Sequence, residues 1–316
     1  MRYTILGQTG IKVSYLCFGC LTISPLQRNL PINKGVDLLV YAFDMGINFY
    51  DTAELYKTNE YLKEFIKLRP RQDIVIATKS YAYDARGAQQ SLEKALREMG
   101  TDYIDIFLMH EQESDLTIKG HYEALEYYLK ARDKGFIRAV GLSTHNIRAV
   151  TASIKYEGIQ VIHPIINYKG VGIEDGGIDD MLEAVSNAYS AGKGIYAMKP
   201  LGGGTLIKDR QACFDFVLGL KNIHSIAVGM QTREEVSANI AVFNGRKIPD
   251  DIYNKLGQYR RKLHIDDWCE GCGNCKDHCG QKALKIIHGK ARVDEKKCIL
   301  CGYCGAKCPL FCIKII

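Results

Sequence analysis

Cysteine is spread very unevenly along this chain of 316 residues. Cys17, Cys20 and Cys213 precede residue 264, whereas the other nine cysteines lie in the last 50 residues. The N-terminus lacks the apolar segment of a secretory signal, so we expect a cytoplasmic protein. Because cytosolic thiols stay reduced, this density favours metal coordination over disulfides. It also predicts a domain boundary, with one domain over residues 1–263 and another over residues 264–316.

The cysteine-rich segment contains the same spacing, C-x₂-C-x₂-C-x₃-C, twice. The two runs are offset by 29 residues and comprise Cys269, Cys272, Cys275 and Cys279, then Cys298, Cys301, Cys304 and Cys308. The first three thiolates of a run can surround one cuboidal cluster, while the fourth reaches the neighbouring cluster. The pattern therefore predicts two [4Fe–4S] clusters, with Cys308 on the first and Cys279 on the second. The alternative is two four-cysteine zinc sites, which usually use CxxC pairs separated by a longer loop.

Residues 266–316 resemble bacterial-type ferredoxin domains over their whole length. Each half is a cysteine loop followed by an expected strand, which implies a small α+β fold. Gly280 stands where proline usually follows the fourth cysteine, although Pro309 is present in the second half. The ninth cysteine, Cys312, aligns with Ala283 in the repeat, so we interpret it as a packing residue. We interpret Cys17 and Cys20 in the same way.

The first domain alternates strand-like and helical patterns. Eight apolar runs indicate strands: Leu16–Cys20, Ile47–Asp51, Ile74–Lys79, Ile104–His110, Ala139–Thr144, Val161–Asn167, Ile195–Pro200 and Ser225–Met230. Eight strands alternating with helices over about 250 residues are typical of a (β/α)₈ barrel, an α/β fold. The alternative is a doubly wound sheet, which normally needs fewer strands.

Other elements follow from local patterns. A hairpin is expected over Tyr3–Leu6 and Lys12–Ser14, ahead of the first barrel strand. Apolar residues recur at helical spacing over Gly87–Met99 and Gly120–Lys134. Thr232 is followed by Glu235, as in a helix-capping box. A last helix is expected over Pro249–Leu263, leading to the cysteine-rich domain.

Polar residues end three successive barrel strands. Asp51 ends the second strand, with Tyr56 shortly after it, Lys79 ends the third and His110 ends the fourth. Catalytic groups of this fold collect at such carboxyl-terminal strand ends. The segment from Gly46 to Glu60 resembles the aldo-keto reductase signature, and the resemblance extends over residues 1–245. It implies that Asp51, Tyr56, Lys79 and His110 form a catalytic tetrad for NAD(P)H-linked carbonyl and alcohol interconversion.

The chemistry of reduction explains these residue types. Hydride delivery to a carbonyl carbon leaves an alkoxide that must be protonated. Tyr56 can supply the proton, and we expect the ammonium of Lys79 to lower its pKa. A buried lysine needs a counter-ion, for which Asp51 is the candidate. His110 can donate to the carbonyl oxygen and orient it.

The same resemblance implies a set of dinucleotide contacts. The candidates are Ser143, Asn167, Met198, Lys199, Leu201, Gly202, Gly229, Thr232, Arg233 and Asn239. Thr144, His163 and Met198 replace residues that are usual in the family. Gly202-Gly203-Gly204 follows the seventh strand, where this fold binds phosphate. Glu235 would repel a 2′-phosphate while Arg233 would attract one, so the choice between NADH and NADPH stays open.

These features support two hypotheses. The first is an NAD(P)H-linked oxidoreductase acting on a small carbonyl or alcohol, with an attached electron-transfer module. The second is an electron carrier or redox sensor whose barrel binds nucleotide or flavin without carbonyl turnover. Clusters pass single electrons whereas nicotinamide passes a hydride, so a bound flavin or a partner such as ferredoxin or flavodoxin fits either hypothesis.

Charge and hydropathy exclude other classes of protein. The net charge of +6 is spread along the chain without a Lys/Arg block, unlike a nucleic-acid-binding protein. Apolar stretches fall short of the roughly 18 residues that span a bilayer, so we expect no membrane insertion.

Overall fold

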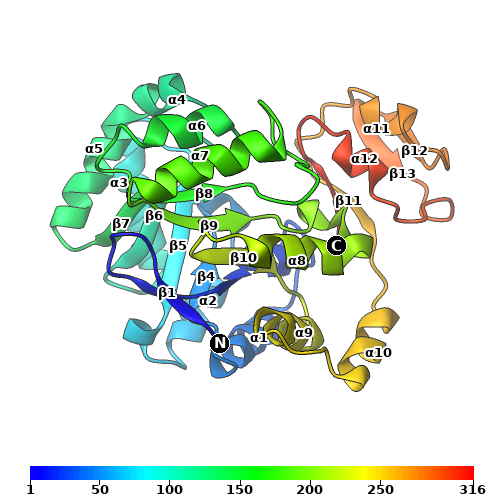
Figure 1. Ribbon diagram of the computed structural model, residues 1–316, viewed down its shortest axis with the longest axis horizontal. Helices are drawn as coiled ribbons and strands as arrows, with labels where there is room; N and C mark the ends of the chain where they lie inside the picture. The colour runs from blue at the N-terminus through cyan, green and yellow to red at the C-terminus, as the bar shows by residue number, and fades with distance from the viewer.

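Eight parallel strands close into a barrel in the computed structural model, which describes residues 1–316 (Figure 1). Around the barrel the strand order is β10-β3-β4-β5-β6-β7-β8-β9. The strands are β3 (Leu16–Gly19), β4 (Phe49–Asp51), β5 (Val75–Ser80), β6 (Ile104–Met109), β7 (Ile137–Thr144), β8 (Val161–Pro164), β9 (Gly194–Met198) and β10 (Ser225–Gly229). The predicted (β/α)₈ barrel is confirmed, and the doubly wound alternative is wrong.

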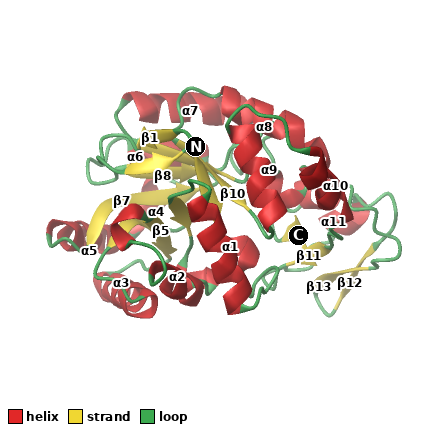
Figure 2. Ribbon diagram, turned by 90° about the horizontal axis from the view of Figure 1, so that it is seen from below, coloured by secondary structure: helices red, strands yellow, loops and turns green.

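Helices surround the strands on the outside of the barrel (Figure 2). They are α1 (Ile32–Asp44), α2 (Asn59–Ile66), α3 (Ala85–Met99), α4 (Asp115–Gly120), α5 (Tyr122–Asp133), α6 (Ile147–Ser153), α7 (Ile178–Ser190), α8 (Arg210–Gly219), α9 (Arg233–Phe243) and α10 (Asp250–Gln258). Thr232 caps α9 by accepting a hydrogen bond from the Glu235 amide. None of the helices is both long and apolar enough to cross a membrane.

Two predicted helices differ from the structure. The pattern over Gly120–Lys134 is split at His121, which lies between α4 and α5 in a non-helical conformation. The helix expected to reach Leu263 ends at Gln258, because Tyr259 turns to extended backbone. Leu263 instead begins strand β11 (Leu263–Ile265), where alternating apolar side chains suit strand pairing better than a helix.

Two apolar layers hold the barrel together. Inward-facing residues such as Phe49, Ala77 and Tyr196 fill its interior. A larger layer between strands and helices contains 53 buried residues. The hairpin of β1 (Tyr3–Ile5) and β2 (Lys12–Ser14) pairs as predicted and inserts Leu6 into the interior layer. Side chains therefore fill the barrel interior at the amino-terminal ends of the strands, and the carboxyl-terminal end is left for a cavity.

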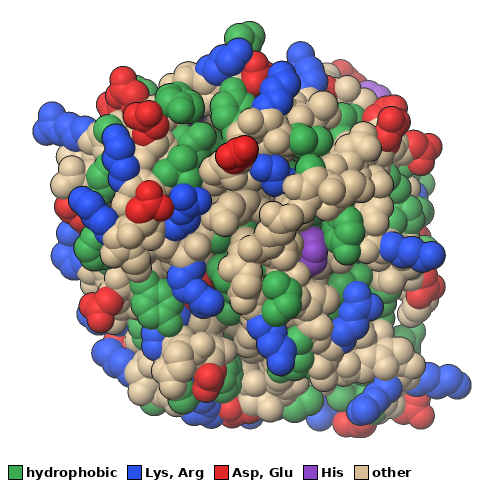
Figure 3. Space-filling view, turned by 60° about the vertical axis from the view of Figure 1, so that its left-hand side comes forward, with side chains coloured by type: hydrophobic (Ala, Val, Ile, Leu, Met, Phe, Trp, Pro, Cys, Tyr) green, Lys and Arg blue, Asp and Glu red, His purple; other side chains and the backbone are tan.

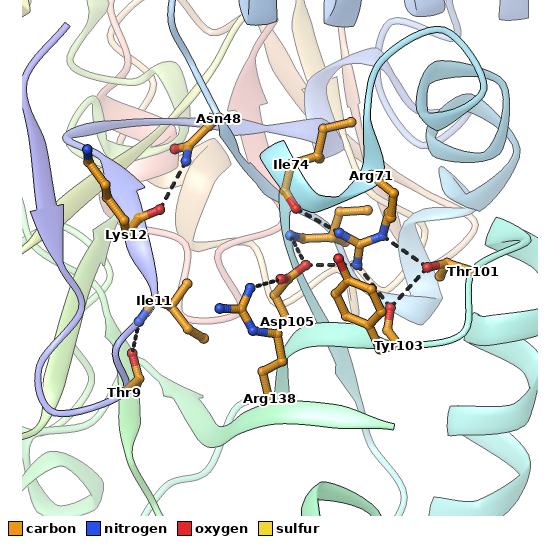
Figure 4. Close-up of polar contacts among 11 residues, drawn as sticks. Thr9, Ile11, Lys12, Asn48, Arg71, Ile74, Thr101, Tyr103, Asp105 and Arg138 are labelled. Atoms are coloured by element: carbon orange, nitrogen blue, oxygen red, sulfur yellow. Dashed lines mark hydrogen bonds and ion pairs between the residues drawn. The ribbon is translucent and has the colours of Figure 1, made fainter. Parts of the chain in front are cut away.

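A buried charge cluster lies near the amino-terminal ends of the strands (Figure 4). Asp105, at the start of β6, is completely buried and accepts from Arg71, at 2.8 Å, and from Arg138, at 2.6 Å. The Ile76 amide donates to the same carboxylate. These bonds tie three neighbouring strands to one another at the end of the barrel opposite the predicted active site.

The cysteine-rich segment forms a separate small unit beside the barrel (Figure 1). It contains two antiparallel pairs, β11 with β14 (Ile313–Ile315) and β12 (Leu284–Ile287) with β13 (Lys290–Val293). Two short helices, α11 (Asn274–Asp277) and α12 (Tyr303–Ala306), contact each other. Each half thus has the cysteine loop and the strand that the internal repeat predicts, and a short helix that was not predicted.

The surface mixes both signs of charge. On the face shown in Figure 3, Lys and Arg side chains are interspersed with Asp and Glu rather than gathered in one basic patch.

Candidate active site

The four predicted catalytic residues meet at the carboxyl-terminal end of the barrel. Alternation along a strand places Lys79 on the same face as Ala77, which lies in the barrel interior. Asp51 follows Phe49 and His110 follows Leu108 in the same way. Strand geometry therefore turns all three polar side chains inward, and the short 3₁₀ turn Glu54–Tyr56 brings Tyr56 beside them.

Lys79 and Asp51 form a buried ion pair. The ammonium lies 2.7 Å from both carboxylate oxygens and also donates to the Thr52 carbonyl oxygen. Lys79 is 1% exposed and Asp51 is 5% exposed. All three donors of the ammonium have partners here, so the orientation of the lysine is fixed before any ligand binds.

Tyr196 and His163 complete the surroundings of Asp51, although no sequence pattern assigned the tyrosine a role. The Tyr196 hydroxyl donates to Asp51 Oδ1 at 2.9 Å. The His163 ring stacks on Tyr196 with centroids 3.8 Å apart, and its Nδ1 lies 2.6 Å from the Tyr196 carbonyl oxygen. In the sequence, Tyr196 is one more apolar residue of a strand. Only the closure of the barrel brings β9 opposite β4.

Tyr56 departs from the expected electrostatics. The Lys79 ammonium lies 5.2 Å from the centroid of its ring. Desolvation, followed by the negative charge of Asp51, raises the pKa of Tyr56 well above its ordinary value. The expected lowering is therefore wrong for this structure, because Asp51 neutralises Lys79 at closer range. The tyrosine keeps its proton at neutral pH, as a proton donor must.

His110 is a neutral imidazole with one unused nitrogen. Burial, then the positive charge of Lys79, lowers the pKa of His110 to about 3. Its Nδ1 is buried without a hydrogen-bond partner. Tyr81 stacks on the ring at 4.3 Å between centroids, and Tyr56 meets it edge-on at 6.0 Å. An unpaired buried polar atom is costly in a protein interior, and this nitrogen is enclosed by protein rather than exposed to the cavity.

A cavity opens above these residues and extends across the mouth of the barrel. It encloses about 1090 Å³, part of it open to solvent. Asp51, Tyr56 and His163 form its inner end. Its outer part lies between the loops after β9 and β10 and the C-terminal unit, which contributes Lys314, Ile315 and Ile316 to the wall. A cleft whose lining runs from Asp51 at the floor of the barrel to Arg261 in the linker suits an extended organic ligand.

The eight predicted cluster ligands gather around two smaller cavities. The first, of about 290 Å³, is lined by Cys269, Cys272, Cys275 and Cys308. The second, of about 350 Å³, is lined by Cys298, Cys301, Cys304 and Cys279. The fourth cysteine of each run thus lies with the other triad. No group of three His, Cys, Asp or Glu side chains is close enough to hold a single metal ion.

Backbone amides also point at these sulfurs. The Ala283 amide donates to Cys279 Sγ at 3.3 Å and the Ala291 amide donates to Cys269 Sγ at 3.4 Å. Each amide thus directs the positive end of its N–H at a sulfur of the predicted ligand set. Cys312 lines the first cavity as well, with its Sγ 3.3 Å from that of Cys308. It is buried as predicted, but it packs against the ligand set rather than in a remote core.

Comparison with known proteins agrees with both halves of the chain. The model described as "Aldo/keto reductase family" matches residues 15–216, and that described as "4Fe-4S dicluster domain" matches residues 261–309. The chain belongs to the aldo/keto reductase family. It is an oxidoreductase of this family with an iron–sulfur module, which we call the iron–sulfur domain (residues 264–316).

Individual aldo/keto reductase relatives are distant. L-galactose dehydrogenase of Arabidopsis thaliana is 24% identical over 75% of this chain and 86% of its own length. A probable aldo-keto reductase of Glycine max is 30% identical over 63% of this chain and 59% of its own length. A solved aldo-keto reductase structure from Pseudomonas aeruginosa has 25% identity and a TM-score of 0.66, covering 77% of this chain and 95% of its own.

Half of the predicted dinucleotide contacts line the large cavity of this aldo/keto reductase. They are Met198, Lys199, Leu201, Gly229 and Asn239. Lys199 has a left-handed backbone with φ of 56°, which is uncommon outside glycine. Burial lowers the pKa of Lys199 to about 7. Its ammonium lies 2.6 Å from His145 Nε2.

The other predicted contacts face elsewhere. Ser143 Oγ accepts from the Glu111 amide, and the Asn167 side chain bonds both ways with Val171. Thr232 is occupied as the cap of α9. Arg233 lies over the Tyr41 ring, 5.0 Å from its centroid. Gly202 adjoins the cavity wall without lining it.

Two arginines line the outer part of the cavity that the sequence did not single out. Arg261 forms an ion pair of 2.6 Å with Glu235 and so neutralises the carboxylate expected to repel a 2′-phosphate. Arg210 lines the same end, half-buried and without an ion-pair partner. Arg261 lies in the linker before β11, where no family motif marks it. Its position depends on how the two domains pack.

Proposed function

We propose that the protein catalyses NAD(P)H-linked interconversion of a small carbonyl compound and its alcohol, with two [4Fe–4S] clusters as an attached electron-transfer module. The observation that carries this proposal is the fixed Asp51–Lys79 pair beside a protonated Tyr56 and a neutral His110. Asp51 and Tyr56 line the inner end of an elongated cavity, with Lys79 bonded to Asp51 and the His110 ring edge-on to Tyr56. The cytoplasm is the proposed location, because it keeps nine clustered cysteines reduced.

The residues divide the work of reduction. Bound nicotinamide supplies a hydride to the carbonyl carbon. Tyr56 donates the proton that the developing alkoxide requires, and its raised pKa keeps that proton in place at neutral pH. His110, a neutral imidazole edge-on to Tyr56, orients the carbonyl oxygen. Lys79 and Asp51 hold the floor of the site rigid and exclude water from it.

We propose NADPH rather than NADH as the nucleotide. The Glu235 carboxylate is already paired with Arg261, and Arg210 is a second, unpaired cation at the same end. Arginine is well suited to bidentate phosphate binding. Replacement by Arg210→Ala should raise KM for NADPH while leaving KM for NADH nearly unchanged. Equal effects on both cofactors would contradict this assignment of a 2′-phosphate site.

The clusters serve single-electron exchange. A hydride carries two electrons, whereas each cluster accepts only one. Transfer from nicotinamide to the two clusters therefore needs an intermediate that first accepts both electrons. A flavin, bound in the cavity or carried by a flavodoxin partner, would supply that step, whereas a ferredoxin partner would exchange single electrons with the clusters. Protein purified without oxygen should contain about eight iron atoms and eight sulfides per chain. Stoichiometric zinc would contradict the cluster assignment, and a flavin assay of the same sample distinguishes the two routes.

Turnover decides between the enzyme and the electron carrier. The purified holoprotein should oxidise NADPH with some members of a panel of small aldehydes and ketones. Oxidation of NADPH with one-electron acceptors but with no carbonyl compound would favour the alternative, an electron carrier or redox sensor whose barrel binds the nucleotide without carbonyl turnover.

A further inference from the structure

The iron–sulfur domain supplies part of the wall of the cofactor cavity. Its last strand, β14, ends beside the loop after β9, and Lys314 and Ile315 line the cavity together with Gly203 and Gly204 of that loop. The approach is close, since a Cβ on Gly204 would lie 2.1 Å from the Ile315 carbonyl oxygen. Backbone bonds between Lys262 and the residue after β14 hold this edge. The barrel alone therefore does not complete the cavity.

Phe311, also from the iron–sulfur domain, belongs to the core of the barrel. It is 6% exposed and packs in the layer between barrel strands and helices, not with the apolar residues of its own domain. Gly172 and Gly203 flank the ring. A Cβ on either would lie 2.8 Å from a ring atom, and both have positive φ, 87° and 65°. The barrel loops are thus shaped to admit this one side chain.

The ring of Phe311 contacts the polar wall of the cavity. The Lys199 ammonium lies 4.4 Å from the ring centroid, and the His145 ring meets it edge-on at 5.9 Å. A cation over an aromatic face is attracted by the ring quadrupole. Phe311 therefore helps to position Lys199, which lines the cofactor cavity.

The segment that contains Phe311 and β14, residues 308–316, begins at the first cluster cavity. Cys308 and Cys312 line that cavity on either side of Phe311. The Phe311 amide donates to the Cys308 carbonyl oxygen, and the Asp266 amide donates to the Cys312 carbonyl oxygen. Within nine residues, the chain passes from a cluster ligand to the barrel core and then to the cofactor cavity.

We propose that loading of the first cluster and binding of the dinucleotide are energetically coupled through this segment, residues 308–316. The inference rests on the proposed function, in which a dinucleotide occupies the cavity. A bound cluster fixes the position of Cys308. Because Phe311 and β14 follow in the same segment, the cluster also holds Phe311 against Lys199 and holds β14 in the cavity wall. Without the cluster, four thiols lose their common ligand and the wall loses its anchor. Such coupling is reciprocal and typically amounts to about 5–150-fold in affinity.

Calorimetric titration with NADP⁺ and NAD⁺ tests the coupling without turnover. Binding is measured for the anaerobic holoprotein, for the full chain after chelation of its iron, and for the same chain after reconstitution with iron and sulfide. We expect the dissociation constant to rise at least fivefold on cluster removal and to recover on reconstitution. In parallel, hydrogen exchange at residues 199–206 should be faster in the cluster-free chain.

Phe311→Leu locates the coupling in the segment. It keeps an apolar side chain but removes the aromatic face from Lys199, so the ratio of cluster-free to holo dissociation constants should fall towards one. Phe136→Leu, the same change at an exposed phenylalanine just before β7, is the matched control and should keep the wild-type ratio. Iron content confirms that both variants still load clusters.

The outcomes separate the inference from the function. Equal binding by holo and cluster-free wild-type protein would overturn the inference and leave the proposed function standing. If Phe311→Leu keeps the wild-type ratio of cluster-free to holo dissociation constants, the inference is also overturned, because the coupling does not pass through this segment. Failure of the holoprotein to bind either dinucleotide would overturn the proposed function and the inference together.

Discussion

Each end of the barrel buries a carboxylate, and the two carboxylates have different surroundings. Asp105 at the amino-terminal end accepts from two arginines and a backbone amide (Figure 4). Asp51 at the carboxyl-terminal end accepts from Lys79 and Tyr196. Beside Asp105 the donors are all satisfied by protein, whereas beside Asp51 a histidine nitrogen has no partner and a cavity opens.

This difference separates stability from chemistry within one fold. A polar cluster whose members satisfy one another has nothing left to offer a ligand, so it contributes only to folding. A cluster with unused donors is poorer in stability and able to bind. Catalytic sites of (β/α)₈ barrels lie at the carboxyl-terminal end and stabilising features at the other. The following four variants or conditions test that division, from the largest expected effect to the smallest.

Lys79→Met should lower both the rate of reduction and the stability. Lys79 lies at the carboxyl-terminal end of the barrel with Tyr56, and it is also half of a buried ion pair. Carbonyl reduction should fall by about 10²–10⁴-fold. Stability should fall by about 3–5 kcal/mol, since Asp51 is left as a buried charge without its cation. Steady-state NADPH oxidation and urea unfolding measure the two effects. A variant with wild-type stability would show that Tyr196 alone suffices for Asp51.

Tyr56→Phe should damage only the chemistry. The ring and its packing remain while the proton donor is lost, so reduction of an aldehyde should fall by about 10²–10⁴-fold. Nucleotide affinity, iron content and the unfolding midpoint should stay at wild-type values. Tyr81→Phe, at the neighbouring ring that stacks on His110, is the matched control and should have a much smaller effect on the rate. A wild-type rate in Tyr56→Phe would remove the tetrad from the mechanism.

Asp105→Ala should damage only stability. Removal of a buried carboxylate that holds Arg71 and Arg138 should cost about 3–5 kcal/mol in the free energy of unfolding. The rate per folded molecule should not change, because the cluster lies at the opposite end of the barrel from Tyr56. Denaturant unfolding measures the free energy of unfolding, and active-site titration with a rate assay gives the rate per folded molecule. A loss of rate per folded molecule would show that the two ends are not independent.

The smallest expected effect is a pH dependence of nucleotide binding from Lys199. Its pKa of about 7 reflects burial, partly opposed by the charge of Glu111, while Lys314 and Lys79 lower it further. A bound phosphate group favours the ammonium, so affinity should be highest below pH 7 and weaken as the pH rises through 7–8. Each unit by which the nucleotide raises this pKa corresponds to about tenfold in affinity.

Lys199→Met supplies the control, because it should bind nucleotide weakly at every pH. Titration of His145, which touches the same ammonium, would instead leave a pH dependence in the variant, and that result would contradict the assignment to Lys199.

The barrel, and the meeting of Asp51, Tyr56, Lys79 and His110 at one end of it, could be predicted because both follow from local patterns. Apolar runs mark the strands, and the parity of Phe49 with Asp51, or of Ala77 with Lys79, decides which side chains turn inward. The cluster cysteines could be predicted from spacing for the same reason. Since each of these signals lies within a few residues, no knowledge of long-range packing was needed.

What could not be predicted depends on distant parts of the chain meeting. Tyr196 reaches Asp51 only because the barrel closes, and Arg261 reaches Glu235 only because the linker folds back. Ser143 and Asn167 carry side chains that suit a ligand, but neighbouring backbone groups occupy them first. Competition of this kind leaves no trace in a sequence motif. The prediction of a lowered pKa for Tyr56 was wrong for a similar reason, because it considered the charge of Lys79 without that of Asp51.

The glycines at 203 and 204 restrict how such a two-domain protein can arise. Any side chain at these positions would collide with Phe311 or Ile315. A barrel whose corresponding loop carries larger residues cannot accept this domain by gene fusion alone, since the loop must first lose its side chains. Small residues at both positions, together with an aromatic residue three places after the last cluster cysteine, therefore form a sequence signature by which other fused chains of this architecture can be recognised.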